Sequence, residues 1–227
     1  MSHFTEKGCL FLKNVYTNDI IDMINLEINN FIRNNNIMEH LNKKIDVAEE
    51  TFYVNNTYSM LNSFEKMFYY YLPVIDNRGT HDRSIDVGVY DFFHIEKLMP
   101  NIIPLVDMFM LVEILKKISG SNWKFFRANL QFHTNVSNPQ SFHIDNVDKE
   151  TVKICIYLTD ISENESGPPM YIEGTHIDKK NFKQKDVKTF LGKKGDILIS
   201  MSNGFHRKMP QTKHSIHGFL VFHFVKI

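Results

Sequence analysis

Three stretches between Trp123 and the C-terminus alternate between apolar and polar residues. In "WKFFRANLQFH" one face carries Phe126, Ala128, Leu130 and Phe132, and the other Arg127, Asn129, Gln131 and His133. In "TVKICIYLTD" Val152, Ile154, Ile156 and Leu158 oppose Lys153, Cys155, Tyr157 and Thr159; in "HSIHGFLVFHFV" Ile216, Leu220, Phe222 and Phe224 oppose His217, Phe219, Val221 and His223. A period of two is typical of strands with one face in an apolar core. These stretches therefore predict β-sheet in this half of the chain.

The polar faces of these strands carry histidine, glutamine and lysine, which suits a hollow that holds a polar ligand. A small barrel or sandwich with helices over its outer face would satisfy this pattern. Short strands, turn clusters such as "NVSNPQ" and helices gathered toward the N-terminal half fit this arrangement better than alternating βαβ units. We therefore expect a β-rich α+β fold.

Two segments have the spacing of packing helices. In "TNDIIDMINLEINNFIRNN" isoleucines recur at helical spacing behind a cap at Thr17 or Asn18. The second helix is predicted from Pro104 to about Ser119, because proline begins it, lysines occupy its last turn and Gly120 follows. The aromatic, irregular segment from about 35 to 101 predicts no definite element.

Length and charge narrow the function classes. At 227 residues we expect one domain, 1–227, with a helical and irregular half (about 1–120) and a β-rich half (about 121–227). Basic and acidic residues balance at 26 each, so the charge pattern of a nucleic-acid binder is missing. The lysine-rich stretch at 179–188 reads as a solvated loop. A small-molecule partner is favoured, and the sequence sets no oligomeric state.

Cys9 and Cys155 form no CxxC pair, which favours a reducing compartment over a disulfide framework. The N-terminal residues lack the long apolar region of a signal peptide, and no apolar run reaches membrane-spanning length. We therefore expect a cytoplasmic protein that does not bind membranes.

The tripeptide "HID" occurs twice, at His143 to Asp145 and at His176 to Asp178. Histidine and aspartate two positions apart on a strand point to the same face and can share a metal ion. The first copy follows the turn "SNPQ" and precedes a predicted strand, whereas the second runs into a lysine-rich loop. Context therefore favours His143 and Asp145 as the metal ligands.

A facial metal site needs a third ligand from a later strand. His206 follows the predicted strand in "KKGDILISMSNGFHRKMP". Two histidines and one carboxylate leave coordination positions open, as in non-haem Fe(II) oxygenases. Local sequence is equally consistent with a surface histidine beside Arg207 and Lys208.

The order "FTEKGCLFLKNVYTNDIIDMI", "LQFHTNV", "FHIDN", "SGPPMYIEGTH", "KKGDILIS" and "GFHRKMP" resembles the phytanoyl-CoA dioxygenase-like Fe(II)/2-oxoglutarate oxygenases. The resemblance implies a double-stranded β-helix (a jelly-roll, cupin-like core), with His143, Asp145 and His206 as iron ligands and 2-oxoglutarate and O2 as cosubstrates. It also explains the second HID, since His176 stands where the family has the histidine of the "SGPPMYIEGTH" loop.

The family's usual arginine for the far carboxylate of 2-oxoglutarate lies eleven positions after the distal histidine, which here is His217. A histidine provides neither a permanent charge nor a two-pronged grip. Three explanations remain open: His217 binds as imidazolium, with its pKa raised by the carboxylate; Lys153 or Arg127 supplies the charge; or 2-oxoglutarate binds weakly or not at all. Gln131 matches a strand glutamine that helps to hold the cosubstrate in some relatives.

The resemblance implies hydroxylation of a small molecule, with release of succinate and CO2. Related halogenases replace the carboxylate ligand with a small residue, so Asp145 favours hydroxylation over chlorination. Arg83, Asp86 and Asp91 are candidates for contact with a polar substrate, although surface salt bridges explain them as well. The rival interpretations are a cupin-like binding module without turnover and, more weakly, a structural zinc site.

Overall fold

The structure is a computed structural model that describes residues 3–35, 51–53, 74–77, 88–145 and 150–227. Its helices are α1 (His3–Lys7), α2 (Asn18–Asn34), α4 (Ile95–Leu98) and α5 (Met108–Ser119), with short 3-10 helices η3 (Pro100–Leu105) and η4 (Gln184–Asp186). Its strands are β1 (Cys9–Leu12), β2 (Thr51–Tyr53), β3 (Val74–Asn77), β4 (Val89–Phe93), β5 (Trp123–Thr134), β6 (Thr151–Tyr157), β7 (Pro169–Ile172), β8 (Val187–Thr189), β9 (Ile197–Met201), β10 (His206–Lys208) and β11 (Ile216–Lys226).

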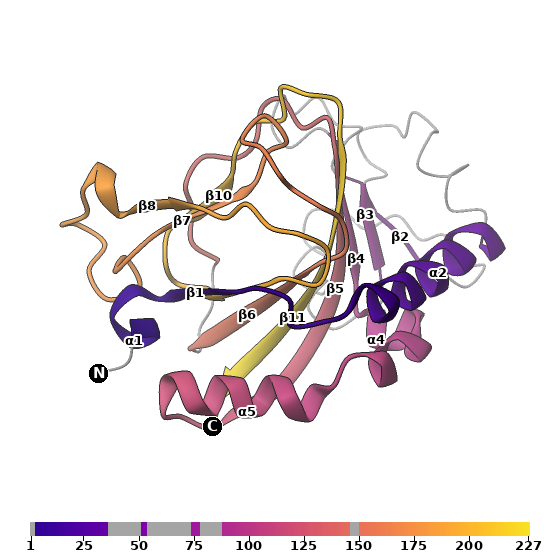
Figure 1. Cartoon of the computed structure of the whole chain (residues 1–227), viewed down its shortest axis with the longest axis horizontal. Coiled ribbons are helices and arrows are strands. Elements are labelled where there is room, and N and C mark those ends of the chain that lie inside the picture. The colour runs from indigo at the N-terminus through magenta and orange to yellow at the C-terminus, as the bar shows by residue number, and fades with distance from the viewer. Residues whose placement is uncertain (1–2, 36–50, 54–73, 78–87, 146–149) are drawn as a thin grey trace.

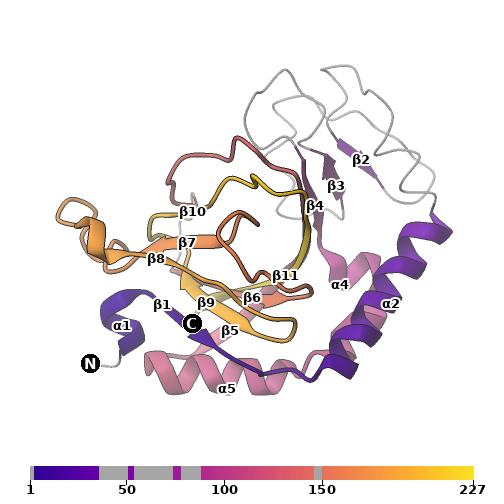
Figure 2. The same cartoon turned by 45° about the horizontal axis from the view of Figure 1, so that its top comes forward.

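The strands form two antiparallel sheets. Within the described residues, the large sheet has the order β1-β9-β6-β11-β5-β4-β3-β2 and the small sheet the order β10-β7-β8. A single bridge between His143 and His206 adds the segment after β5 to the edge of the small sheet. From β5 onward the chain passes back and forth between the two layers (Figure 2). Residues of both layers line one cavity.

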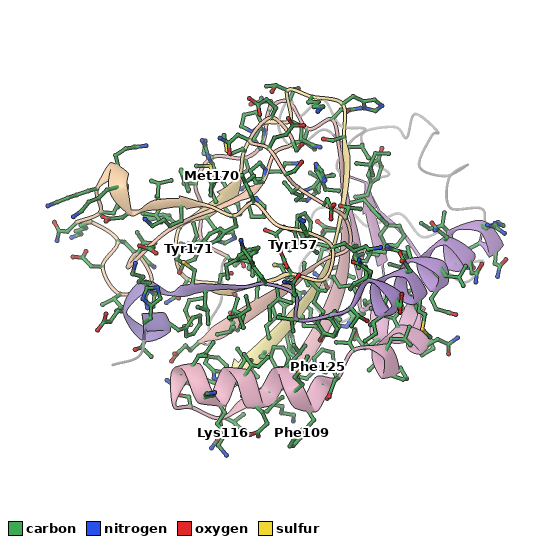
Figure 3. The ribbon with its side chains drawn as sticks, in the orientation of Figure 1. Phe109, Lys116, Phe125, Tyr157, Met170 and Tyr171 are labelled. Atoms are coloured by element: carbon green, nitrogen blue, oxygen red, sulfur yellow. The ribbon has the colours of Figure 1, made fainter. Side chains whose placement is uncertain are left out.

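The main apolar core lies between the large sheet and the helices. Helix α5 runs beneath β5, β6 and β11, and α2 lies along the β4 side (Figure 1). Leu111 and Leu115 of α5 are fully buried, whereas Phe109 is 76% exposed and points away from the sheet (Figure 3). This core contains the inner residues of β6 and β11, among them Val152, Ile154, Ile156, Leu220, Phe222 and Phe224. The apolar faces predicted from the sequence are therefore the helix-facing side of the sheet.

The two predicted helices are present, with one corrected boundary. Helix α2 begins after Thr17, whose hydroxyl accepts a hydrogen bond from the Ile20 backbone N–H. The second helix begins at Met108 instead of Pro104, because Asp107 caps it by accepting a bond from Met110 N–H. Pro104 lies in the preceding 3-10 helix, and Gly120 ends α5 in the left-handed conformation at φ 70°.

Two residues assigned to the apolar faces are not in the core. Phe126 is 38% exposed because β5 bulges there: β11 pairs His223 with Arg127 and Phe224 with Phe125, so Phe126 has no partner in the ladder. Phe125 takes its place and packs against the rings of Phe222 and Phe224. Ile216 is 59% exposed at the start of β11, where the strand extends beyond the core. These predictions were wrong because a regular alternation cannot show a bulge or a strand end.

The carboxylate of Glu96 connects α4 to β5. Its Oε1 lies 2.6 Å from His94 Nδ1, and its Oε2 accepts a hydrogen bond from the Ala128 backbone N–H at 3.1 Å. Burial alone would raise the pKa of Glu96, but the hydrogen bonds from His94 and Ala128 outweigh it and lower the pKa below 4.5. The ionised carboxylate therefore stabilises the fold.

We expect Glu96→Gln to lower the free energy of unfolding at pH 7 by about 1–2 kcal/mol. Because the pKa is lower in the folded state, this contribution is fully present above the unfolded value of 4.5 and is lost as the pH falls through the folded value. Urea unfolding at pH 7 and at decreasing pH measures it, with exposed Glu113→Gln as the control. A difference between Glu96→Gln and the parent protein that does not shrink with falling pH would contradict this role.

No helix within the described parts of the chain is long and apolar enough to cross a membrane. Cys9 and Cys155 are both free cysteines.

Candidate metal centre

The backbone brings His143 and His206 together at the edge of the small sheet. His143 N–H donates to the His206 carbonyl at 3.1 Å, and His206 N–H donates to the His143 carbonyl at 2.9 Å. The next residue on the same side of that segment, Asp145, is held by its N–H, which donates to the Ser202 carbonyl at 3.1 Å. The imidazole centroids lie 4.6 Å apart. The first HID copy and the later histidine therefore form one cluster.

Both imidazoles are oriented in the same way. Nδ1 of His143 lies 2.9 Å from the Ser141 carbonyl, and Nδ1 of His206 lies 2.9 Å from the Gly204 carbonyl. A carbonyl only accepts, so each Nδ1 carries the proton and each Nε2 keeps its lone pair. Burial, followed by the charge of His206, lowers the pKa of His143. A metal-binding histidine requires this orientation of the ring, and the lowered pKa of His143 favours the neutral imidazole that binds a metal.

Asp145 provides the negative charge of the cluster. Its Oδ2 lies 2.7 Å from Lys153 Nζ, and its Oδ1 lies 3.5 Å from His206 Nε2. Burial alone would raise the pKa of Asp145, but the Lys153 ammonium and His206 outweigh it and hold the pKa far below its usual range. The carboxylate is therefore ionised at neutral pH.

The donor atoms of His143, Asp145 and His206 all lie within 4.8 Å of one another. Lys153 Nζ is also 2.9 Å from His206 Nε2, so a cation already lies against two of the three donor sites. The set of two imidazoles and one carboxylate fits a divalent transition metal with open positions. For a metal ion to bond to the same atoms, the Lys153 ammonium must move away, which its flexible four-carbon stem permits.

A cavity of about 200 Å³ opens beside this cluster. Its walls come from both sheets: Val89, Gln131, His133, Gln140, Lys153, Cys155, Pro169, Met170, Leu198, Ser200, Arg207, Lys208 and Phe219, together with the three cluster residues. Tyr157 and Phe219 pack edge to face between the layers, with ring centroids 5.0 Å apart. The face of β5, β6 and β11 that the sequence predicted to be the hollow side is the side that lines this cavity.

The residues predicted for cosubstrate binding do not all reach the cavity. Gln131 and Lys153 line it. His217 does not line it, although its register partner His133 does, and His217 is 3% exposed. Arg127 does not line the cavity, and its Cζ lies 5.5 and 5.7 Å from the ring centroids of Phe93 and Phe126.

The second HID copy lies away from the cavity wall, in the turns after β7. His176 Nε2 donates to the Thr5 carbonyl at 3.1 Å and so ties this loop to α1. The Asp178 carboxylate accepts hydrogen bonds from Lys180 N–H at 2.8 Å and Asn181 Nδ2 at 2.7 Å. Both residues therefore have local structural roles, as the sequence context indicated.

Lys208, which is not among the site residues predicted from the sequence, also lines the cavity. The signal was available, since Lys208 is two positions after His206 and must share its side of a strand. Of the substrate candidates, Arg83 and Asp86 lie outside the described residues. Asp91 is fully buried on β4, opposite Gln131, and is neither a surface residue nor part of the cavity wall.

No family model and no curated protein matches the sequence. Solved structures do match over 98% of this chain. One is the non-haem alpha-ketoglutarate-dependent epimerase SnoN from nogalamycin biosynthesis, with 10% identity, 79% of that chain covered and a TM-score of 0.65. Another is the carbocyclase SnoK from the same biosynthesis, with 13% identity, 81% covered and a TM-score of 0.66. A third is HygX from Streptomyces hygroscopicus with nickel and 2-oxoglutarate bound, with 12% identity, 84% covered and a TM-score of 0.62. The chain therefore shares the β-rich fold of these proteins.

Proposed function

We propose that this protein is a non-haem Fe(II)- and 2-oxoglutarate-dependent oxygenase that hydroxylates a small molecule, with His143, Asp145 and His206 as its iron ligands. The observation that carries this proposal is the ligand geometry: two imidazoles with Nδ1 hydrogen-bonded to backbone carbonyls and one ionised carboxylate lie together in the wall of a cavity. Such a facial set leaves three positions open to exchangeable ligands.

The strand order supports a double-stranded β-helix as the scaffold. From β5 onward the chain crosses repeatedly between the sheets: β5, β6, β9 and β11 lie in the large sheet, and the His143 bridge, the β7-β8 pair and β10 lie in the small one. The shared fold with SnoN, SnoK and HygX agrees with this architecture. The phytanoyl-CoA dioxygenase-like resemblance accounts for the order of the motifs along it, and we propose that the chain is one domain of this kind.

When bound, iron and 2-oxoglutarate would supply the oxidising power: one oxygen atom of O2 would end in the succinate left when the keto acid loses CO2, and the other in the hydroxyl of the product. The residues of the chain would hold the metal ion and orient its ligands. The Ser141 and Gly204 carbonyls fix the two imidazole rings, and Asp145 neutralises part of the metal charge. Leu198, Phe219 and Met170 give the cavity apolar walls that limit access of water.

The size of the cavity suits a compact cosubstrate. Its volume of about 200 Å³ lies below the roughly 300–1,000 Å³ typical of sites for drug-sized ligands. Among the solved neighbours, SnoN has been determined with Fe3+, alpha-ketoglutarate and a nogalamycin compound, and HygX with nickel, 2-oxoglutarate and hygromycin B. We propose that the substrate of this protein is likewise a small molecule, which approaches from outside the cosubstrate cavity.

The test is to add Fe(II) and 2-oxoglutarate without O2, look for a weak visible charge-transfer band, then admit O2 and measure succinate. We expect a band and slow succinate release in the parent protein, and neither in His206→Ala. The absence of both from the folded parent protein would overturn the oxygenase assignment. Metal binding without a band or succinate would instead support the cupin-like binding module, an alternative favoured by the uncharged His217 position.

A further inference from the structure

The position that would carry the carboxylate-binding arginine holds no permanent charge in this protein. His217 is buried there, with Nδ1 3.5 Å from Thr159 Oγ1. Burial, followed by the charge of Lys208, lowers the pKa of His217, and the Ser166 backbone offsets this only in part. A neutral imidazole cannot neutralise a carboxylate brought into a buried site, so a cation must come from another residue.

The two cations predicted from the sequence, Arg127 and Lys153, contact other groups and lie away from His217. Arg127 lies against the rings of Phe93 and Phe126 and does not line the cavity. Lys153 lies at the metal end, where its Nζ contacts Asp145 and His206. Its register partners on β9 and β11 are Ser200 and His223, so it lies six residues along β11 from His217. A carboxylate near His217 is therefore out of its reach while it stays at the metal end.

Lys208 lies on the same strand as the metal ligand His206 and lines the same cavity. It follows His206 by two residues on β10, so both side chains point to the same side, about 6–7 Å apart along the strand. Both residues line the cavity. A five-carbon diacid is of similar length, so a ligand held at His206 can extend along the strand toward Lys208. Arg207, between them, also contributes to the cavity wall, but its guanidinium stacks on Phe142, with Cζ 4.7 Å from the ring centroid.

The Lys208 ammonium is held in place by a buried amide. Its Nζ donates to Gln211 Oε1 at 3.0 Å. Gln211 is itself buried and fixed, because the same Oε1 accepts from Val136 N–H at 2.8 Å and its Nε2 donates to Ser215 O at 3.0 Å. An ammonium with three donors can keep this bond and still bind a carboxylate. Its position is therefore set before any ligand binds.

We propose that Lys208 pairs with the far carboxylate of 2-oxoglutarate, with His217 beside it as a neutral hydrogen-bonding group. This inference rests on the proposed function and names the residue that selects the cosubstrate. The binding strand is then β10, which also carries the metal ligand His206, in place of β11. The site should favour 2-oxo diacids of this length over 2-oxo acids that lack the second carboxylate.

The experiment measures binding without turnover. Protein loaded with Ni(II) is titrated calorimetrically with 2-oxoglutarate and with 2-oxobutyrate, which has the chelating end but no far carboxylate. The variants are Lys208→Met, Lys208→Arg and, as a matched control, Lys188→Met on the outer strand β8 of the same sheet. Ni(II) affinity is measured for each protein first, so that a loss of the metal site is not mistaken for a loss of the anchor.

We expect Lys208→Met to weaken 2-oxoglutarate binding by about 10- to 100-fold, because a charge-assisted hydrogen bond is lost, while Ni(II) and 2-oxobutyrate bind as before. Lys208→Arg should retain most of the affinity, and Lys188→Met all of it. Unchanged 2-oxoglutarate affinity in Lys208→Met would overturn this inference and leave the oxygenase proposal intact. A parent protein that binds Ni(II) but neither keto acid would overturn the proposed function, and this inference with it.

Discussion

Replacing Asp145 with alanine is expected to weaken Fe(II) binding by more than about 100-fold, since even the loss of a residue that only orients a metal ligand costs roughly 10–100-fold. Asp145 supplies the only carboxylate of the donor cluster found among the described residues. Its removal also leaves the Lys153 ammonium, now 2.7 Å from Asp145 Oδ2, without that counter-charge at the site. The remaining positive charge repels an incoming metal ion and adds to the loss of the ligand.

The chain carries its own control for this experiment. Asp178 occupies the same place in the second HID copy, but it is an exposed residue whose carboxylate only holds the turn at Lys180 and Asn181. Asp178→Ala should therefore bind Fe(II) as the parent protein does. Asp145→Asn, which keeps the shape but not the charge, should fall close to Asp145→Ala. Anaerobic titration with Fe(II) measures all four proteins, and equal affinities for the Asp145 and Asp178 variants would refute the ligand assignment.

Replacing Gly204 with alanine is expected to lower the free energy of unfolding by about 3 kcal/mol, at the upper end of the usual cost of overpacking. A Cβ at Gly204 would overlap the hydroxyl and ring carbon of Tyr171, whose side chain lies inside the molecule (Figure 3). Tyr171 is 1% exposed and its hydroxyl donates to the Met201 carbonyl, so it has little room to move. The backbone of residue 204 must shift instead.

That shift should also reach the metal centre, because the Gly204 carbonyl accepts the hydrogen bond from His206 Nδ1. We therefore expect Gly204→Ala to weaken Fe(II) binding as well as stability. Gly120→Ala is the control: its Cβ would meet nothing within 4 Å, so only the cost of a left-handed alanine remains and metal binding is unaffected.

The loss of stability caused by Gly204→Ala should be smaller in a Tyr171→Leu background, where the overlapping atoms are gone. A cost that is the same in both backgrounds would show that Tyr171 is not the cause.

The sequence predicted those features of the fold that depend on neighbouring residues. Helix α2 and its Thr17 cap, the strand faces of β6 and the inward face of β11 from Phe219 all follow from local periodicity and end signals. The start of α5 and the bulge at Phe126 could not be predicted in this way, because each depends on which backbone groups are hydrogen-bonded in the folded chain. The β-rich class with few helices was predicted correctly, and the pairing of β1 with β9 was not foreseen.

In the candidate site, too, the sequence predicted the features that depend on local pattern and missed those that depend on the fold. The choice of the first HID copy and of His206 followed from their places between predicted strands and from a family resemblance, and the structure places their donor atoms together. The proposed substitutes for the missing arginine, Lys153 and Arg127, were on the correct face by alternation. Alternation gives the face of a sheet but not the position along it, so it could not show that Lys153 reaches Asp145 or that Arg127 turns to aromatic rings.

The sequence by itself determined that His143 and Asp145 could share a metal ion, because the spacing of an imidazole and a carboxylate two positions apart is a local property; the third donor, His206, joins them only through the pairing of distant segments. Only the tertiary structure decided which charges face one another. His217 and Lys208 are nine residues apart, yet their strands place them close enough for the charge of Lys208 to lower the pKa of His217. The physical reason is that an electrostatic interaction depends on distance and burial, and both are set by how the two sheets pack together.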